Sequence, residues 1–134
     1  MREQRNKWLW NPSTGYIGVI HLGMYFSEIP DSISLVKLKR FEEENYDTYE
    51  IKDANGSKVF VERGYVKAVM CGDKFFLGDQ NLIGLTVYEL KNLIPHDWEL
   101  AGEGVYYNKA LSITAYTIEE KIKWITVDSW DNNI

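Results

Sequence analysis

The chain has 134 residues, 45% of them hydrophobic and 26% charged, which is the size and composition of a single globular domain. Its net charge of −5 would repel phosphate backbones, so we expect no nucleic-acid partner. No apolar run approaches the roughly 20 residues of a membrane span, no secretory signal stands out, and the single Cys71 excludes an internal disulfide. We therefore expect a cytoplasmic protein that makes no membrane contact.

The first 45 residues alternate short apolar runs with turn residues. Residues 6–10 resemble a short strand, which the turn residues at 11–15 close, and 16–21 form a second apolar run. Residues 31–45 fit a strand or a helical turn, and the pattern leaves both open.

The next segment predicts a meander of antiparallel strands. Residues 47–52 and 57–62 flank Asn55-Gly56, a pair that supplies the positive φ angles of a tight hairpin turn. Arg63-Gly64 turns the chain into a strand at 65–71, and Gly72-Asp73 turns it again before 75–78.

Residues 86–94 predict a short helix. Thr86 and Glu89 have the spacing of a capping box, the apolar residues after Thr86 fall close to one stripe, and Pro95 ends the helix. Strands are then expected at 104–107, 111–116 and 121–127, separated by turns.

Two octets carry the same pattern, LGMYFSEI at 22–29 and IGLTVYEL at 83–90, and similar strand pairs follow both. We therefore predict an α+β fold in one domain, 1–134, with pseudo-repeats at about 16–78 and 79–130. Each would hold a short helix and a three-stranded antiparallel meander, and the two would form one larger sheet with helices on one face. Gly23 and Gly84 would turn the chain into each helix, and Glu28 and Glu89 would cap the helix start.

This pattern resembles the repeat of beta-lactamase-inhibitor-protein-like and SmpA/OmlA-like domains over about residues 20–127. The matching residues are Leu22-Gly23-Met24 with Glu28-Ile29, and Ile83-Gly84-Leu85 with Glu89-Leu90. Ile29-Pro30 and Ile94-Pro95 stand where such repeats commonly have Leu-Gly-x-Pro. The resemblance implies a binding protein with a concave or flat sheet face, either an inhibitor or an assembly factor.

No motif in the sequence indicates catalysis or metal binding. His21 and His96 lack the spacing of a zinc site, no phosphate loop is present, and Cys71 fits a strand residue that faces the core. Adjacent carboxylates fall in loops, where they are normally solvated. We expect a protein that is not an enzyme and binds no metal and no cofactor.

The two halves differ in charge. Residues 1–67 hold 10 basic and 10 acidic residues, whereas 68–134 hold 5 and 10, so the second half would steer a basic partner. We expect an immunity protein that neutralises a cognate bacterial toxin, as in contact-dependent growth inhibition, for example by covering the basic cleft of a nuclease. An assembly or scaffold module is the alternative, followed by a small-ligand-binding protein or an enzyme with a site between the repeats.

The residues predicted to contact the partner lie in the second repeat, and the stretch 128–131 is the preferred one. They are Asp97, Trp98, Glu99, Glu103, Glu119, Glu120, Asp128, Trp130 and Asp131. Interfaces favour aromatic residues ringed by polar ones, which is the basis for including both tryptophans. Core packing remains the alternative for Trp98.

Overall fold

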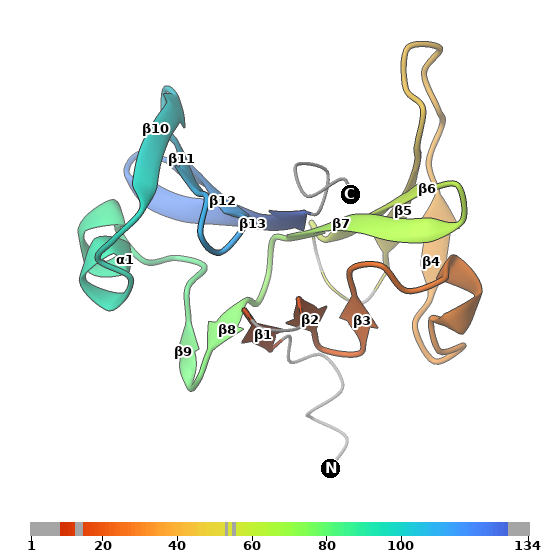
Figure 1. Cartoon of the computed structure of the whole chain (residues 1–134), viewed down its shortest axis with the longest axis horizontal. Coiled ribbons are helices and arrows are strands. Elements are labelled where there is room, and N and C mark those ends of the chain that lie inside the picture. Colours follow the sequence, from red (N-terminus) through yellow and green to blue (C-terminus); the bar gives the residue numbers. More distant parts are fainter. Residues whose placement is uncertain (1–8, 13–14, 53, 55, 129–134) are drawn as a thin grey trace.

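The computed structural model describes residues 9–12, 15–52, 54 and 56–128, and most of the regular elements in them are β-strands (Figure 1). The elements are β1 (Trp10–Asn11), β2 (Tyr16–Ile17), β3 (Ile20–His21), the 3₁₀ helix η2 (Phe26–Glu28), β4 (Leu35–Lys37), β5 (Asp47–Ile51), β6 (Lys58–Glu62), β7 (Tyr65–Cys71), β8 (Phe76–Leu77), β9 (Gln80–Asn81), α1 (Val87–Leu93), β10 (Trp98–Gly102), β11 (Val105–Asn108), β12 (Ile113–Ile118) and β13 (Lys121–Asp128).

One antiparallel sheet of eight strands dominates the fold, in the order β10-β11-β12-β13-β7-β6-β5-β4. Figure 1 shows that the outer strands at both ends rise on the same side, so the sheet is curved. The short strands β1–β3 and β8–β9 lie against the middle of the sheet on its convex side, and α1 lies near β10.

The predicted α+β class is therefore wrong. The described part of the chain has one α-helix, each meander has four strands rather than three, and short strands rather than two helices cover the sheet. The cause in the first half is Pro30, which follows the first octet directly and disfavours a helical Ile29. The octet forms only the three-residue η2, whereas Pro95 follows its own octet five residues later and leaves room for α1.

The strand registers of the first meander recur in the second. The pair Val59↔Val69 in β6–β7 corresponds to Ala115↔Ile125 in β12–β13, and a bulge at Phe60/Val61 recurs at Tyr116/Thr117. The two meanders meet where β7 pairs with β13, and the pair Met70↔Thr126 joins two equivalent positions. The sheet thus has an internal pseudo-twofold axis at this pair.

The two octets also dock alike. The amide of Gly23 donates to the carbonyl of Val66 at 2.8 Å, and the amide of Gly84 donates to that of Ile122 at the same distance. The carboxylates of Glu28 and Glu89 accept the amides of Tyr25 and Thr86, at 3.0 and 2.9 Å. The capping roles predicted for these glutamates are confirmed, although the first octet begins a 3₁₀ turn rather than an α-helix.

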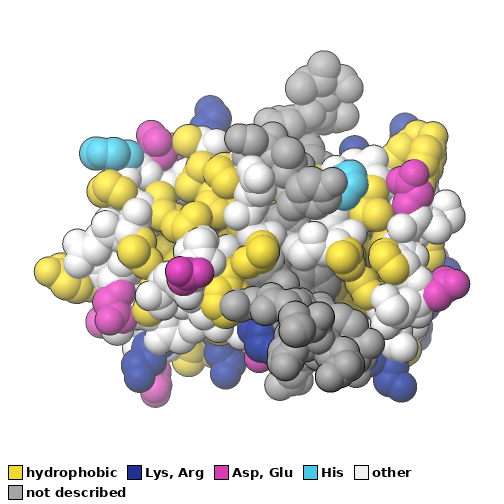
Figure 2. All heavy atoms as spheres, turned by 90° about the horizontal axis from the view of Figure 1, so that it is seen from below, with side chains coloured by type: hydrophobic (Ala, Val, Ile, Leu, Met, Phe, Trp, Pro, Cys, Tyr) yellow, Lys and Arg dark blue, Asp and Glu magenta, His cyan; other side chains and the backbone are white. Residues whose placement is uncertain are grey.

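The core lies between the sheet and the short strands. Its largest fully buried side chains come from the sheet (Val59, Val66, Val69, Ile113, Ile122, Ile125, Val127) and from the covering segments (Ile20, Phe75, Leu82, Leu90). Each such burial contributes about 1.5–3 kcal/mol. Figure 2 views the covered side from below, where apolar side chains gather in groups on the left and on the right of the view and most charged ones lie toward the rim.

Candidate functional site

Three of the predicted contact residues meet at one end of the sheet. The β10–β11 turn carries Glu103 and the β12–β13 turn carries Glu119 and Glu120, and all three are exposed. The two turns are neighbours because the amide and hydroxyl of Thr117 both donate to the carbonyl of Gly104, at 2.8 and 2.9 Å. We call Glu103, Glu119 and Glu120 the acidic end.

The β12–β13 turn has an unusual backbone for its residues. Glu119 and Glu120 both have left-handed conformations, with φ of 54° and 69°. The equivalent β6–β7 turn has Arg63 at 55° and a glycine, Gly64, at 85°. A left-handed conformation costs an L-residue about 1–2 kcal/mol, and glycine avoids this cost. The turn of the second half therefore has two left-handed residues that are not glycine, both of them glutamates, whereas the turn of the first half has one, Arg63, followed by a glycine.

Contacts with the start of α1 hold this turn in place. The amide of Val87 donates to the carbonyl of Glu120 at 3.1 Å, and Thr86 forms an isolated bridge with Lys121. The next residue of α1, Tyr88, is 75% exposed, and Ile118 just before the turn is 51% exposed. Aromatic and apolar side chains surrounded by a polar rim are typical of protein-binding surfaces.

A hollow of about 330 Å³ opens beside the same turn. Ile83, Ile118 and Ile122 line its apolar part, and Glu119, Lys121 and Lys123 line its charged part. The acidic end is therefore contoured rather than flat, with room for a side chain of a partner next to Glu119.

The other predicted contact residues lie elsewhere. Asp128 ends β13 and is separated from Lys121 by about 23 Å, at about 3.3 Å per residue. Asp97 precedes β10 at that same far end, and the exposed Glu99 lies on β10 between the two ends. Trp130 and Asp131 lie outside the described residues, so the preferred stretch 128–131 stays a prediction.

Trp98 is half-buried and points inward. Its indole Nε1 donates to the carbonyl of Ile94 at 2.6 Å, and its ring packs against the core cluster. This placement agrees with the core alternative, and partner contact by Trp98 stays a prediction.

Sequence reasoning missed an exposed aromatic pair in the first half. The rings of Tyr25 and Tyr65 stack with centroids 4.6 Å apart, and the hydroxyl of Tyr65 donates to that of Tyr25 at 3.0 Å. This hydrogen bond raises the pKa of Tyr65. The two residues are 40 positions apart and meet only through the docking of the octet, so no local pattern could have identified them. Their counterparts in the second half are Thr86 and Lys121.

Metal-binding groups and the cysteine were the remaining candidates for chemistry in the described residues. They contain no group of three or more His, Cys, Asp and Glu side chains that could hold a metal ion. Cys71 is fully buried, and burial raises the pKa of its thiol above the ordinary value, which makes it a poor nucleophile. No helix within the described ranges is long and apolar enough to cross a membrane.

Comparison with known proteins gives no relative: no protein-family model, curated protein or solved structure matches this chain. The resemblance to beta-lactamase-inhibitor-protein-like and SmpA/OmlA-like domains therefore stays a prediction.

Proposed function

We propose that this protein is a non-enzymatic inhibitor that binds a basic partner protein through its acidic end. The specific form of the proposal is an immunity protein that covers the cleft of a cognate bacterial toxin, such as a nuclease. The observation that carries it is the pair Glu119–Glu120, both left-handed and both exposed. Strain of this kind persists where the structure around it fixes the chain, and it concentrates at functional sites.

The geometry suits electrostatic docking. The turn is fixed by the bond from Val87 to Glu120, so binding would lose little conformational freedom there. Glu103 lies next to the pair, and three carboxylates together can occupy a cleft that is built for phosphate groups. Tyr88 and Ile118 would add apolar contact area around them.

The test is growth protection by co-expression with the toxic domain that the neighbouring gene encodes. We expect the unchanged protein to restore growth and the triple variant Glu103→Lys, Glu119→Lys, Glu120→Lys to lose protection. Its free energy of unfolding should stay within about 1 kcal/mol of the unchanged value, as for other surface changes.

The matched control reverses the same number of exposed carboxylates in the first half, Glu42→Lys, Glu43→Lys, Glu50→Lys. This control has the same net charge as the test variant and should protect fully. Full protection by the acidic-end variant, or equal loss in both variants, would contradict the proposed docking surface.

A further inference from the structure

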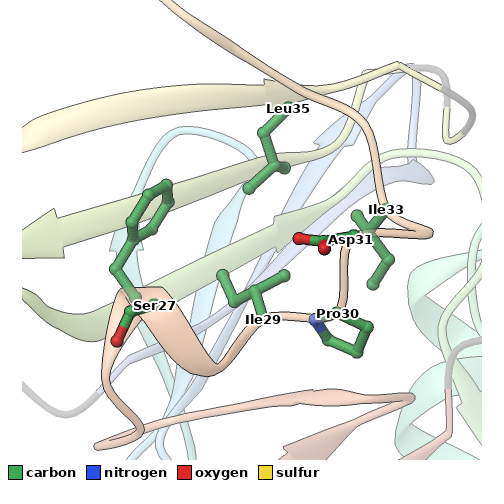
Figure 3. Close-up of a pocket in the computed structure, with 7 residues that line it drawn as sticks. Ser27, Ile29, Pro30, Asp31, Ile33 and Leu35 are labelled. Atoms are coloured by element: carbon green, nitrogen blue, oxygen red, sulfur yellow. The ribbon is translucent and has the colours of Figure 1, made fainter.

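A pocket of about 300 Å³ opens in the first half between η2 and β4 (Figure 3). Phe26, Ile29, Ile33 and Leu35 form its apolar walls, and Asp31 supplies a carboxylate. The wall at Phe26 is fixed because its ring stacks on Tyr49 with centroids 4.4 Å apart. A volume of this size lies at the lower end of the range for ligand pockets.

The internal symmetry shows what occupies the corresponding place in the second half. The β4–β5 pairs Leu35↔Ile51, Val36↔Glu50 and Lys37↔Tyr49 correspond to the β10–β11 pairs Trp98↔Asn108, Glu99↔Tyr107 and Leu100↔Tyr106. Leu35 and Trp98 are therefore equivalent positions on the two outermost strands of the sheet.

In the second half, the indole of Trp98 packs against the core beside α1. Its Nε1 donates at 2.6 Å to the carbonyl of Ile94, the residue that ends α1. In the first half, Leu35 is smaller and Pro30 ends the helix after one turn. The pocket lies between the helix and the outermost strand, as the indole of Trp98 does.

We propose that this pocket binds the indole ring of an exposed tryptophan on a partner protein. The ring would pack against Ile29, Ile33 and Leu35, as Trp98 packs against the core of its own half. Figure 3 shows the carboxylate of Asp31 directed toward the middle of the lining residues. This carboxylate has no hydrogen bond or ion pair to another residue in the described ranges, and it can accept the indole N–H.

This site is separate from the acidic end. Figure 1 places β4 at one end of the sheet and α1 with β10 at the other. The inference thus adds a second recognition element and does not depend on the charge of Glu119 and Glu120.

The test is a titration of the full chain, with its isoleucine and leucine methyl groups labelled with ¹³C, using N-acetyl-tryptophanamide as the probe. We expect saturable methyl shifts at Ile29, Ile33 and Leu35, with a dissociation constant in the millimolar range suited to so small a ligand. N-acetyl-leucinamide and N-acetyl-lysinamide should bind at least about tenfold more weakly. Tighter binding of the lysine probe would assign the pocket to a basic side chain and overturn the proposal.

Two reciprocal variants locate the site. Leu35→Trp places in the pocket the ring that the second half already has, and it should abolish the shifts. Trp98→Leu should create a second responsive pocket near Ile94, whereas Asp31→Asn should weaken binding by removing the charged acceptor. Circular dichroism shows whether Leu35→Trp folds. If it does not fold, the test is whether the ring protons of the probe contact the Leu35 methyl groups of the unchanged protein, and the absence of such contacts refutes the inference. Methyl shifts that persist in a folded Leu35→Trp protein would also refute it.

Discussion

The β12–β13 turn holds Glu120 at φ 69°, and replacing this residue with glycine should stabilise the protein. Removing the strain of a left-handed L-residue should raise the free energy of unfolding by about 1–2 kcal/mol. Glycine lowers the free energy of unfolding by about 0.5–1 kcal/mol because it has more conformational freedom in the unfolded chain. At the midpoints of these ranges the net gain is about 0.75 kcal/mol, or a rise in melting temperature of roughly 2–4 °C for a domain of this size.

The equivalent first-half turn supplies the reciprocal substitution, Gly64→Glu. Gly64 has φ 85°, and a Cβ atom added there meets nothing within 4 Å, so backbone strain alone should decide the effect. We expect destabilisation of about 0.5–1 kcal/mol. Urea unfolding followed by tryptophan fluorescence measures both variants, and the denaturant slope should stay constant. A Glu120→Gly protein that is no more stable than the unchanged chain, beside a destabilised Gly64→Glu protein, would refute the strain argument.

The remaining predictions concern the packing of three residues. Trp98→Leu should cost about 2–3 kcal/mol in urea unfolding, because it leaves a cavity and removes the donor to Ile94; a loss below about 0.5 kcal/mol would contradict this packing. Gly72→Ala should cost about 1–3 kcal/mol, since its Cβ would lie 2.9 Å from the carbonyl oxygen of Gly56; unchanged stability would show that the turn yields. Burial raises the pKa of Cys71 in the folded state, so the unfolded thiol, with a pKa of about 8.5, ionises first and stability should fall as the pH rises above that value. The free energy of unfolding measured at pH 7.5 and 9.5 checks this prediction. In Cys71→Ala, the part of the loss of stability that is due to the thiol should be absent.

Local signals in the sequence predicted several elements correctly. The turn at Arg63-Gly64 joins β6 and β7, and the capping box of Thr86 and Glu89 begins α1, as expected. These features depend on residues within a few positions of one another. The turn and the helix start each require a particular local backbone conformation. The few residues around them are therefore sufficient to predict them.

The outermost strands could not be predicted in the same way. β4 has only three residues within the segment 31–45, whose pattern left strand and helix open. β10 has Leu100 68% exposed and lacks the alternation of a half-buried strand. Because β10 was not predicted, the turn of Glu103 could not be placed beside that of Glu119 and Glu120. Glu103, Glu119 and Glu120 are exposed, but grouping them required the sheet order, and their contact with a partner stays a prediction.

The pocket at Leu35 had no signal in the sequence either. Its walls come from η2, the Pro30 turn and β4, and it becomes interpretable only when register shows that Leu35 and Trp98 are equivalent. An equivalence between two positions that lie 63 residues apart cannot be read from a local pattern. The octets suggested a repeat, but the helix assigned to the first of them was wrong.

The differences between the two halves are informative because the scaffold is otherwise the same. One register accommodates Gly64 in one half and Glu120 in the other, so folding does not require a glutamate in that turn. It likewise accommodates Leu35 and Trp98, so folding does not require the pocket. A strained carboxylate and an unfilled apolar space both reduce stability relative to the alternative that the other half demonstrates. The fold requires neither feature, and each lowers the stability of the protein. Binding to a partner would give a physical reason for both, and each proposal rests on one of them.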